Sequence, residues 1–321
     1  MTYPIIDLHC DLLDYLGRDN KRTPYDSQAR CSITQLQTGG VHLQVLAIYT
    51  KTNPYSVEQA ANQLRCFKHL IQNPSFPTKL FKNELKTDEL QVLLAFENAS
   101  GFCTEDEQLT IGLKRLENIC LNISTPVSIS LTWNEENRFG GGSSTQIGLK
   151  SDGKALLEFL DQHGIAIDLS HTSDALAYDI IDYISNKNLT LRILATHSNA
   201  RKIQNVSRNL PDEIAQEIIR RKGLIGLNLY HSFIGTSIDS ILNHLMHWLE
   251  LGGENSIALG ADFFCSEDIF SEKNPICFFD SIANASTYPF LINFLEKELQ
   301  LPSLNLQKFT YQNALKFIQD N

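Results

Sequence analysis

Several features that mark other classes of protein are missing from this chain of 321 residues. No stretch approaches the ~20 consecutive apolar residues that a membrane-spanning helix needs. The first residues, from Met1 to Asp7, have neither a basic region nor an apolar core of the kind found in signal peptides. We therefore expect neither a membrane association nor a secretory leader.

Cysteines are scarce and unpatterned. There are seven, an odd number, and no two form the C-x-x-C pair of a zinc cage or redox motif. In a chain of this length they are typical of reduced thiols rather than of a disulfide framework, so we predict a cytoplasmic protein. They are Cys10, Cys31, Cys66, Cys103, Cys120, Cys265 and Cys277.

Basic residues are outnumbered, because 27 Lys and Arg stand against 37 Asp and Glu, which gives a net charge of −10. A nucleic-acid-binding protein is expected to carry a basic patch, so the charge argues against that class. Hydrophobic residues make up 42% of the chain, enough for a large core, and no low-complexity linker divides it. We expect a single domain covering residues 1–321.

What the chain does contain is a repeated unit, a short apolar run followed by a segment with helical periodicity. Most runs are almost continuously apolar, which is typical of parallel strands buried on both faces. The repetition predicts an α/β protein with a closed (β/α)₈ TIM barrel. The runs cover residues 4–9, 43–50, 92–97, 127–133, 165–171, 191–197, 224–230 and 257–262.

An open doubly wound sheet is the main alternative fold. A dinucleotide-binding sheet of that type would place G-x-G-x-x-G after an early strand. The glycines Gly140-Gly141-Gly142 follow the fourth run instead, which argues against nucleotide binding.

Three of the intervening helices have recognisable ends. Residues 57–72 place apolar side chains at helical spacing. Asp152 is expected to cap a helix that runs to His163 and stops at Gly164. Residues 211–222 begin with a proline and are followed by Gly223.

Polar side chains gather at the ends of five predicted strands. The first ends in Asp7-Leu8-His9-Cys10-Asp11, and the third, fifth, sixth and eighth end at Glu97, His171, His197 and Asp262. Each alone has a simple structural explanation: a histidine can be a hydrogen-bonding residue, Glu97 a helix cap and Asp262 a turn residue. Their coincidence at the face where barrels carry active sites predicts one functional site.

The residue types favour a site for two divalent metal ions. His9 and Asp11 would project from one extended segment to the same side, His171 and His197 could hold a second ion, and the two oxygens of Glu97 could bridge the pair. Zn²⁺ accepts nitrogen and oxygen ligands of this kind, although the same set suits other ions. Two such ions ~3.5–4 Å apart would generate hydroxide near neutral pH and polarise a carbonyl.

At these residues the chain resembles the membrane (renal) dipeptidase family of the amidohydrolase superfamily. The resemblance extends from Asp7 to the closing Tyr311-Gln312-Asn313-Ala314-Leu315. It is strongest in Ile167-Asp168-Leu169-Ser170-His171, in Thr196-His197-Ser198-Asn199-Ala200-Arg201 and in Ser207-Arg208-Asn209-Leu210.

The resemblance implies a role for each site residue. His9, Asp11 and Glu97 would bind one zinc ion, and Glu97, His171 and His197 the other. Arg208 matches the arginine that receives the substrate carboxylate, for which a planar guanidinium is well suited. Asp262 matches an aspartate that shuttles a proton to the leaving nitrogen, and Tyr230 a position whose backbone helps to hold the carboxylate.

Two positions depart from the family pattern. Trp133 stands where the best-known members have a histidine that stabilises the tetrahedral oxyanion, and an indole N–H can donate a hydrogen bond but cannot be protonated. Bacterial relatives often have tryptophan there followed by asparagine, here Asn134, so we interpret both as substrate-contacting residues of a subfamily. Asn98 follows Glu97 where the family usually has glycine.

The function expected from the residues and the resemblance is hydrolysis of dipeptides, with Glu97 and Asp262 as catalytic residues and a metal-bridged hydroxide as nucleophile. Family members are commonly homodimers. One alternative is another amidohydrolase acting on a different amide or ester; many of these bridge their metals with a lysine on the fourth strand, and residues 127–133 contain no lysine. The other is a non-catalytic peptide-binding barrel, supported only by Trp133.

Overall fold

The computed structural model describes residues 3–86, 88–270, 276–298 and 305–320. Eight parallel strands close into a barrel in the order β1-β2-β4-β5-β6-β7-β8-β9, because β2 pairs with β4 and β9 pairs with β1. The predicted (β/α)₈ barrel is confirmed, and the open doubly wound sheet is wrong. The strands of the ring are β1 (Ile5–Cys10), β2 (Val41–Tyr49), β4 (Leu90–Glu97), β5 (Ser128–Ser130), β6 (Ala166–Asp168), β7 (Ile193–Ser198), β8 (Leu224–Leu227) and β9 (Ile257–Leu259).

A ninth strand, β3 (Thr78–Leu80), lies outside the ring and was not predicted. It pairs with the beginning of β4, where Thr78 is opposite Leu90, whereas β5 pairs with the end of β4, where Phe96 is opposite Ile129. Its sequence, Thr78-Lys79-Leu80, contains two polar residues and so produces no apolar run. Several predicted strands also end earlier than expected, and the rest of each run forms the loop that follows.

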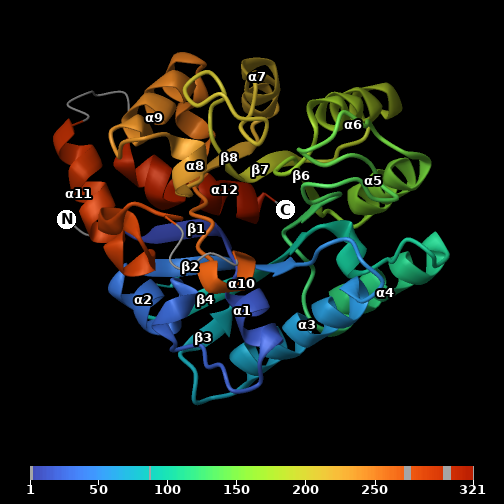
Figure 1. Ribbon diagram of the computed structural model, residues 1–321, viewed down its shortest axis with the longest axis horizontal. Helices are drawn as coiled ribbons and strands as arrows, with labels where there is room; N and C mark the ends of the chain where they lie inside the picture. The colour runs from blue at the N-terminus through green and yellow to red at the C-terminus, as the bar shows by residue number, and fades with distance from the viewer. Residues whose placement is uncertain (1–2, 87, 271–275, 299–304, 321) are drawn as a thin grey trace.

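The helices surround the barrel (Figure 1). The three helices predicted at 57–72, 152–163 and 211–222 are present as α3, α5 and α7. Within the described residues, no helix is long and apolar enough to cross a membrane. The helices are α1 (Leu12–Arg18), α2 (Ile33–Thr38), α3 (Ser56–Gln72), α4 (Leu109–Asn122), α5 (Ser151–Gln162), α6 (Asp174–Lys187), α7 (Asp212–Arg220), α8 (His231–Ile234), α9 (Ser240–Glu250), α10 (Ser266–Ile269), α11 (Tyr288–Glu298) and α12 (Asn313–Gln319).

The predicted cap of α5 is wrong. Lys150 occupies the N-cap position, and Asp152 lies inside the first turn. The Asp152 carboxylate accepts a hydrogen bond from Nε of Arg138 at 2.8 Å. An acidic side chain in the first turn still favours the helix, because it faces the positive end of the helix dipole.

The apolar core has two parts. The larger one lies between the strands and the surrounding helices and includes Phe67, Phe139 and Trp248. The smaller one combines inward-facing strand residues, such as Ile6 and Leu43, with Ala314, Phe317 and Ile318 of α12. The barrel interior is therefore a packed core to which the last helix contributes, and the carboxyl ends of the strands remain available for a site.

Candidate metal centre

Five of the predicted site side chains come together at the carboxyl ends of the barrel strands. His9 lies near the end of β1, Glu97 is the last residue of β4, and His197 lies on β7. Asp11 and His171 lie in the segments just after β1 and β6, respectively. All except Asp11 are buried, with His197 fully so.

Glu97 occupies the centre of the group. Its Oε1 lies 2.7 Å from Nε2 of His171 and 3.9 Å from Nε2 of His197, and its Oε2 lies 3.3 Å from Nε2 of His9. The same His9 nitrogen is 3.8 Å from carboxylate oxygens of both Asp11 and Asp262. One carboxylate therefore reaches imidazoles from three different strand ends.

The side-chain alternation of β1 is interrupted near His9 and Asp11. Ile6 and Leu8 belong to the inner core, Cys10 belongs to the outer core, and the pairing register with β2 shifts between Asp7 and Cys10. Asp11 is the N-cap residue of α1 and not part of an extended segment. The expected geometry of His9 and Asp11 was therefore wrong in detail, because a strand irregularity and a turn bring the two side chains together.

Strand β7 has a similar irregularity, at a register shift between Ala195 and Ser198. Here the carbonyl oxygen of Thr196 approaches the backbone of two glycines. A Cβ atom on Gly226 or Gly260 would lie 1.9 Å or 1.8 Å from that oxygen. Only glycine leaves room at these points for the segment that carries His197.

Asp7 ties the end of β1 to β9. Its Oδ1 accepts hydrogen bonds from the backbone N–H groups of His9 and Ala261, both at 3.1 Å, and its Oδ2 accepts one from the hydroxyl of Tyr288 at 2.6 Å. Asp7 is fully buried. These hydrogen bonds indicate that Asp7 fixes the backbone at His9 and at Ala261, the residue before Asp262.

Two site residues have a backbone conformation that is unfavourable for residues other than glycine. His171 has φ = 67° and Asp262 has φ = 63°. Such left-handed residues cost roughly 1–2 kcal/mol each and are concentrated at functional sites. The turns after β6 and β9 accept this strain and direct both side chains toward Glu97 and His9.

The electrostatics of the group favour a cation. Burial alone would lower the pKa of His9, but the carboxylates of Glu97, Asp11 and Asp262 outweigh it and raise that pKa to about 10. Burial also raises the pKa of Asp11 well above its usual range. These carboxylates stabilise positive charge at Nε2 of His9, which a proton or a metal ion can supply.

His171 responds in the opposite way. Burial, reinforced by the charge of Arg208, lowers the pKa of His171 to about 4. The ring is therefore neutral near pH 7, the form in which histidine binds a metal ion.

The donor atoms fit a metal ion by position as well as by charge. Nε2 of His9 and Oδ1 of Asp11 are buried without a hydrogen-bond partner among the described residues, a condition that costs free energy unless a ligand is bound. Two groups have all their donor atoms within 4.8 Å of one another, His9 with Glu97 and His197, and His9 with Asp11 and Asp262. Mixed nitrogen and oxygen ligands of this kind suit Zn²⁺, Mn²⁺ or Fe²⁺.

Hydrogen bonds orient both of the later histidines. Nδ1 of His171 lies 2.8 Å from Oδ1 of Asn134, which can only accept, so Nδ1 carries the proton and Nε2 keeps its lone pair. Nδ1 of His197 lies 2.7 Å from the hydroxyl of Thr196. Contacts of this kind typically fix the tautomer of metal-binding histidines.

A cavity of about 360 Å³ opens above the group. Four of the five predicted substrate residues line it, namely Trp133, Asn134, Tyr230 and Asp262, together with Asp11, Glu97 and His171. The backbone N–H of Tyr230 already donates to Oδ1 of Asn228 at 2.6 Å. To hold a substrate carboxylate, this N–H would have to give up its hydrogen bond to Asn228.

Arg208 lies beside this cavity and is not among its lining residues. The ring of Phe233, which does line the cavity, lies 5.6 Å from the guanidinium carbon. The guanidinium is buried and donates to Oγ of Ser198 at 3.0 Å and to the carbonyl of His197 at 2.9 Å. Its Nε has no partner among the described residues.

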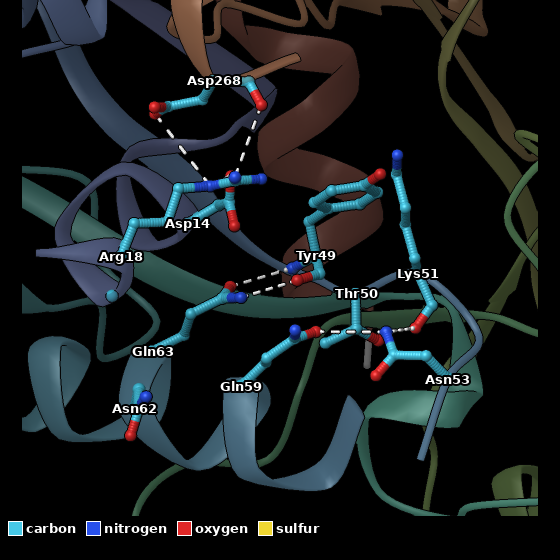
Figure 2. Close-up of a pocket in the computed structure, with 11 residues that line it drawn as sticks. Asp14, Arg18, Tyr49, Thr50, Lys51, Asn53, Gln59, Asn62, Gln63 and Asp268 are labelled. Atoms are coloured by element: carbon cyan, nitrogen blue, oxygen red, sulfur yellow. Dashed lines mark hydrogen bonds and ion pairs between the residues drawn. The ribbon is translucent and has the colours of Figure 1, made fainter. Parts of the chain in front are cut away.

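Tyr49, which was not predicted as a site residue, also lines the cavity. Tyr49 is the last residue of β2 and is paired in register with Glu97 on β4. Figure 2 shows how the buried Gln63 of α3 fixes its backbone: Oε1 of Gln63 accepts from the Tyr49 N–H at 2.9 Å, and Nε2 donates to the Tyr49 carbonyl at 2.6 Å. The signal in the sequence is its position, since Tyr49 is next to the last residue of the second predicted strand at 43–50.

The comparisons with known proteins identify the family and the fold of this chain. The family model of membrane dipeptidase (peptidase family M19) matches residues 1–321. A metallopeptidase of Rhodobacter sphaeroides, solved with a phosphinate mimic of the dipeptide L-Ala-D-Ala, has the same fold, with a TM-score of 0.81 and 19% identity over 99% of both chains.

Two bacterial sequences are related over part of their length. An uncharacterized protein encoded in the pqqA 5′ region of Klebsiella pneumoniae is 27% identical over 209 residues, which are 60% of this chain and 71% of that protein. An uncharacterized protein encoded in the PQQ-III 3′ region of Acinetobacter calcoaceticus is 32% identical over 139 residues, which are 38% of this chain and 42% of the relative.

The match over the whole chain and the grouping of Glu97 with histidines from three strand ends lead to one assignment, and the predicted resemblance is confirmed. This chain belongs to the membrane dipeptidase family of metallopeptidases, metal-dependent dipeptidases built on a TIM barrel.

Proposed function

We propose that the protein hydrolyses dipeptides with two zinc ions, held by His9, Asp11, Glu97, His171 and His197 in a single catalytic domain formed by residues 1–321. The observation that carries the proposal is the position of Glu97, whose two oxygens lie 2.7 Å and 3.3 Å from Nε2 of His171 and of His9. A carboxylate in this position can serve two ions. When bound, such ions supply a water of lowered pKa and polarise the scissile carbonyl.

Arg208 is the proposed anchor for the terminal carboxylate of the substrate. It is a buried guanidinium that forms no ion pair among the described residues, and its Nε still lacks a hydrogen-bond partner. A buried cation without an anion is unstable by itself, so an incoming carboxylate is favoured. This contact selects substrates that end in a free carboxylate one residue beyond the cleaved bond.

Asp262 is the proposed proton carrier. Its Oδ2 accepts a hydrogen bond from Nδ2 of Asn228 at 2.8 Å, so Oδ1, on the side of His9, is the atom that takes up a proton. Burial raises the pKa of Asp262 to about 6. A carboxyl group with a pKa near neutrality can accept a proton and then donate it to the departing amine.

The remaining lining residues orient the substrate. The Trp133 indole and the Asn134 amide offer N–H donors at the cavity, and Tyr230 contributes its ring and, after exchange with Asn228, its backbone N–H. The dimer that the family implies and the cytoplasmic location remain predictions; the location is supported by all seven cysteines being unpaired.

The test is metal content and dipeptide hydrolysis measured together on the purified wild type, on Glu97→Ala and on Glu58→Ala, an exposed carboxylate on α3. We expect about two zinc ions per chain in the wild type and in Glu58→Ala, and loss of metal and activity in Glu97→Ala.

Other outcomes would point to the alternatives. A metal-loaded protein that cleaves no dipeptide but cleaves other amides or esters would indicate a different amidohydrolase. Absence of metal under every loading condition would indicate a peptide-binding barrel.

A further inference from the structure

The cavity above the metal centre has a polar floor and aromatic walls. Its floor consists of Asp11, Glu97, His171 and Asp262, and Asn134 and Ser232 are its other polar residues. The other described lining side chains are aromatic or aliphatic: Tyr49, Trp133, Tyr230, Phe233, Phe264, Ile269 and Phe270. Such a division suits a ligand with a polar group to be processed and an apolar group to be recognised.

The aromatic residues lie on two sides of the barrel mouth. Trp133 follows β5, and Phe264 follows β9. In the ring order β1-β2-β4-β5-β6-β7-β8-β9, strands β5 and β9 are separated by half of the ring. Trp133 and Phe264 therefore stand across the cavity from each other, with the metal ligands below them.

The first wall is the pair of Tyr49 and Trp133. Their rings meet edge to face, with centroids 5.3 Å apart and an interplanar angle of 68°. Gln63 fixes the backbone of Tyr49, as Figure 2 shows, and the ammonium of Lys51 lies 5.5 Å from the centroid of the Trp133 ring. Gln63 and Lys51 thus contact one residue each of this wall.

The second wall is a cluster of rings from the ends of β8 and β9. Phe264 lies 5.7 Å from Tyr230 and 6.3 Å from Phe270, and Tyr230 lies 4.8 Å from Phe233, measured between centroids. Phe278, a buried residue behind the cluster, contacts both Phe264 and Tyr230. The rings therefore form one contact cluster, of which Tyr230, Phe233, Phe264 and Phe270 line the cavity.

Charge adds a second selection. Three carboxylates lie on the floor, and none of the described lining residues of this cavity is a lysine or an arginine. An acidic side chain placed between the two aromatic walls would lose hydration, whereas an apolar side chain gains by leaving water.

We propose that the space between the two walls binds a bulky apolar side chain, leucine-sized or aromatic, so that the enzyme prefers dipeptides that carry one over small or acidic dipeptides. This specificity rests on the proposed dipeptidase function. Discrimination by an apolar pocket reaches roughly 10–200-fold for a single methylene, and we expect at least about a tenfold preference.

The test compares kcat/KM of the metal-loaded enzyme on Ala-Ala, Leu-Ala, Ala-Leu, Phe-Ala, Ala-Phe, Asp-Ala and Ala-Asp. We expect the best leucine or phenylalanine substrate to exceed Ala-Ala by at least about tenfold and the acidic substrates by more. In Phe264→Ala and Phe270→Ala, the ratio of kcat/KM on that substrate to kcat/KM on Ala-Ala should fall toward one. Phe290→Ala, an exposed phenylalanine on α11 that does not line the cavity, should leave the ratio unchanged.

Equal kcat/KM across the panel, or a preference for small or acidic dipeptides, overturns the specificity while leaving the dipeptidase function intact. If no dipeptide is cleaved, the proposed function fails, and calorimetric binding of phosphinate dipeptide mimics decides the specificity separately. Tighter binding of a mimic with a phenylalanine side chain than of one with alanine supports it, and equal binding overturns it.

Discussion

Asp168 at the end of β6 accepts two hydrogen bonds from Thr196 on β7, one from the backbone N–H at 3.0 Å and one from the hydroxyl at 2.5 Å. The Thr196 hydroxyl directs its proton to the Asp168 carboxylate. Its oxygen can therefore only accept a hydrogen bond from Nδ1 of His197, 2.7 Å away. Nε2 of His197 therefore keeps its lone pair toward Glu97. Asp168 thus sets the tautomer of His197 through Thr196.

We expect Thr196→Val to weaken metal binding by about 10–100-fold, the usual cost of removing a hydrogen bond behind a metal ligand. Valine keeps the volume and the backbone hydrogen bond to Asp168 but releases the His197 ring. The measurement is metal affinity by competition with a chelator. Thr190→Val, which removes a hydroxyl bonded to Asp161 at an exposed site, is the matched control. If the metal affinity of Thr196→Val is unchanged, Thr196 does not set the tautomer of His197 in the way proposed.

Arg208→Lys should reduce the preference for a free terminal carboxylate, because an ammonium cannot reproduce the two-pronged contact of a guanidinium. We expect kcat/KM on Ala-Ala to fall by at least about tenfold, with a smaller change on Ala-Ala amide. Arg220→Lys is the control, since Arg220 is an arginine on α7 that pairs with Glu217 of the same helix. The anchoring role is wrong if both substrates lose the same factor.

Asn98 has φ = 81° and uses its side chain to join neighbouring loops. Its Nδ2 donates to the carbonyl of Thr50 at 2.8 Å, and its Oδ1 accepts from Ser100 and Asn137, both at 3.0 Å. Asparagine tolerates positive φ better than most residues, which explains how it replaces the glycine expected here.

Both Asn98→Gly and Asn98→Ala should lose these hydrogen bonds, and the alanine variant should be less stable by about a further 1–2 kcal/mol because of its backbone conformation. Urea unfolding measures the difference. Asn118, exposed within α4, provides the control. Here the order should reverse, and Asn118→Ala should be more stable than Asn118→Gly by about 1 kcal/mol. The same order at both positions would contradict the conformational explanation.

His244 should make the folded state sensitive to acid. Burial lowers the pKa of this histidine to about 4. The hydrogen bonds require the neutral ring, because Nδ1 accepts from the N–H of Ala200 at 3.1 Å while Nε2 faces the carbonyl of Ile234 at 2.9 Å. Protonating Nδ1 would set two N–H groups against each other.

Since the folded-state pKa lies below the ordinary value of 6.5, the unfolded chain binds more protons between about pH 4 and 6.5. The free energy of unfolding therefore falls as the pH falls through that window, by at most roughly 3 kcal/mol from this residue. Urea unfolding between pH 4 and 7 should give a shallower dependence for His244→Gln than for the wild type. Identical slopes would show that His244 does not contribute.

The barrel and the polar side chains at its mouth were accessible from the sequence because both depend on short-range patterns. Parallel strands buried on both faces produce apolar runs such as 92–97, and the end of each run indicates which residue reaches the barrel mouth, as Glu97 and His197 do. The sequence motifs that contain His171 and Arg208 indicated the family. None of these inferences required knowledge of how the strands pair.

What the sequence could not provide depends on contacts between distant segments. The irregularities of β1 and β7 arise from pairing with neighbouring strands and from the space left at Gly226 and Gly260. Tyr49 becomes part of the site because β2 pairs with β4 and because Gln63, on the following helix, holds its backbone. The sequence alone thus determined which chemical groups are present at the barrel mouth. The tertiary structure decided their orientation and protonation and the aromatic walls around them, because these depend on distances between residues far apart in the chain.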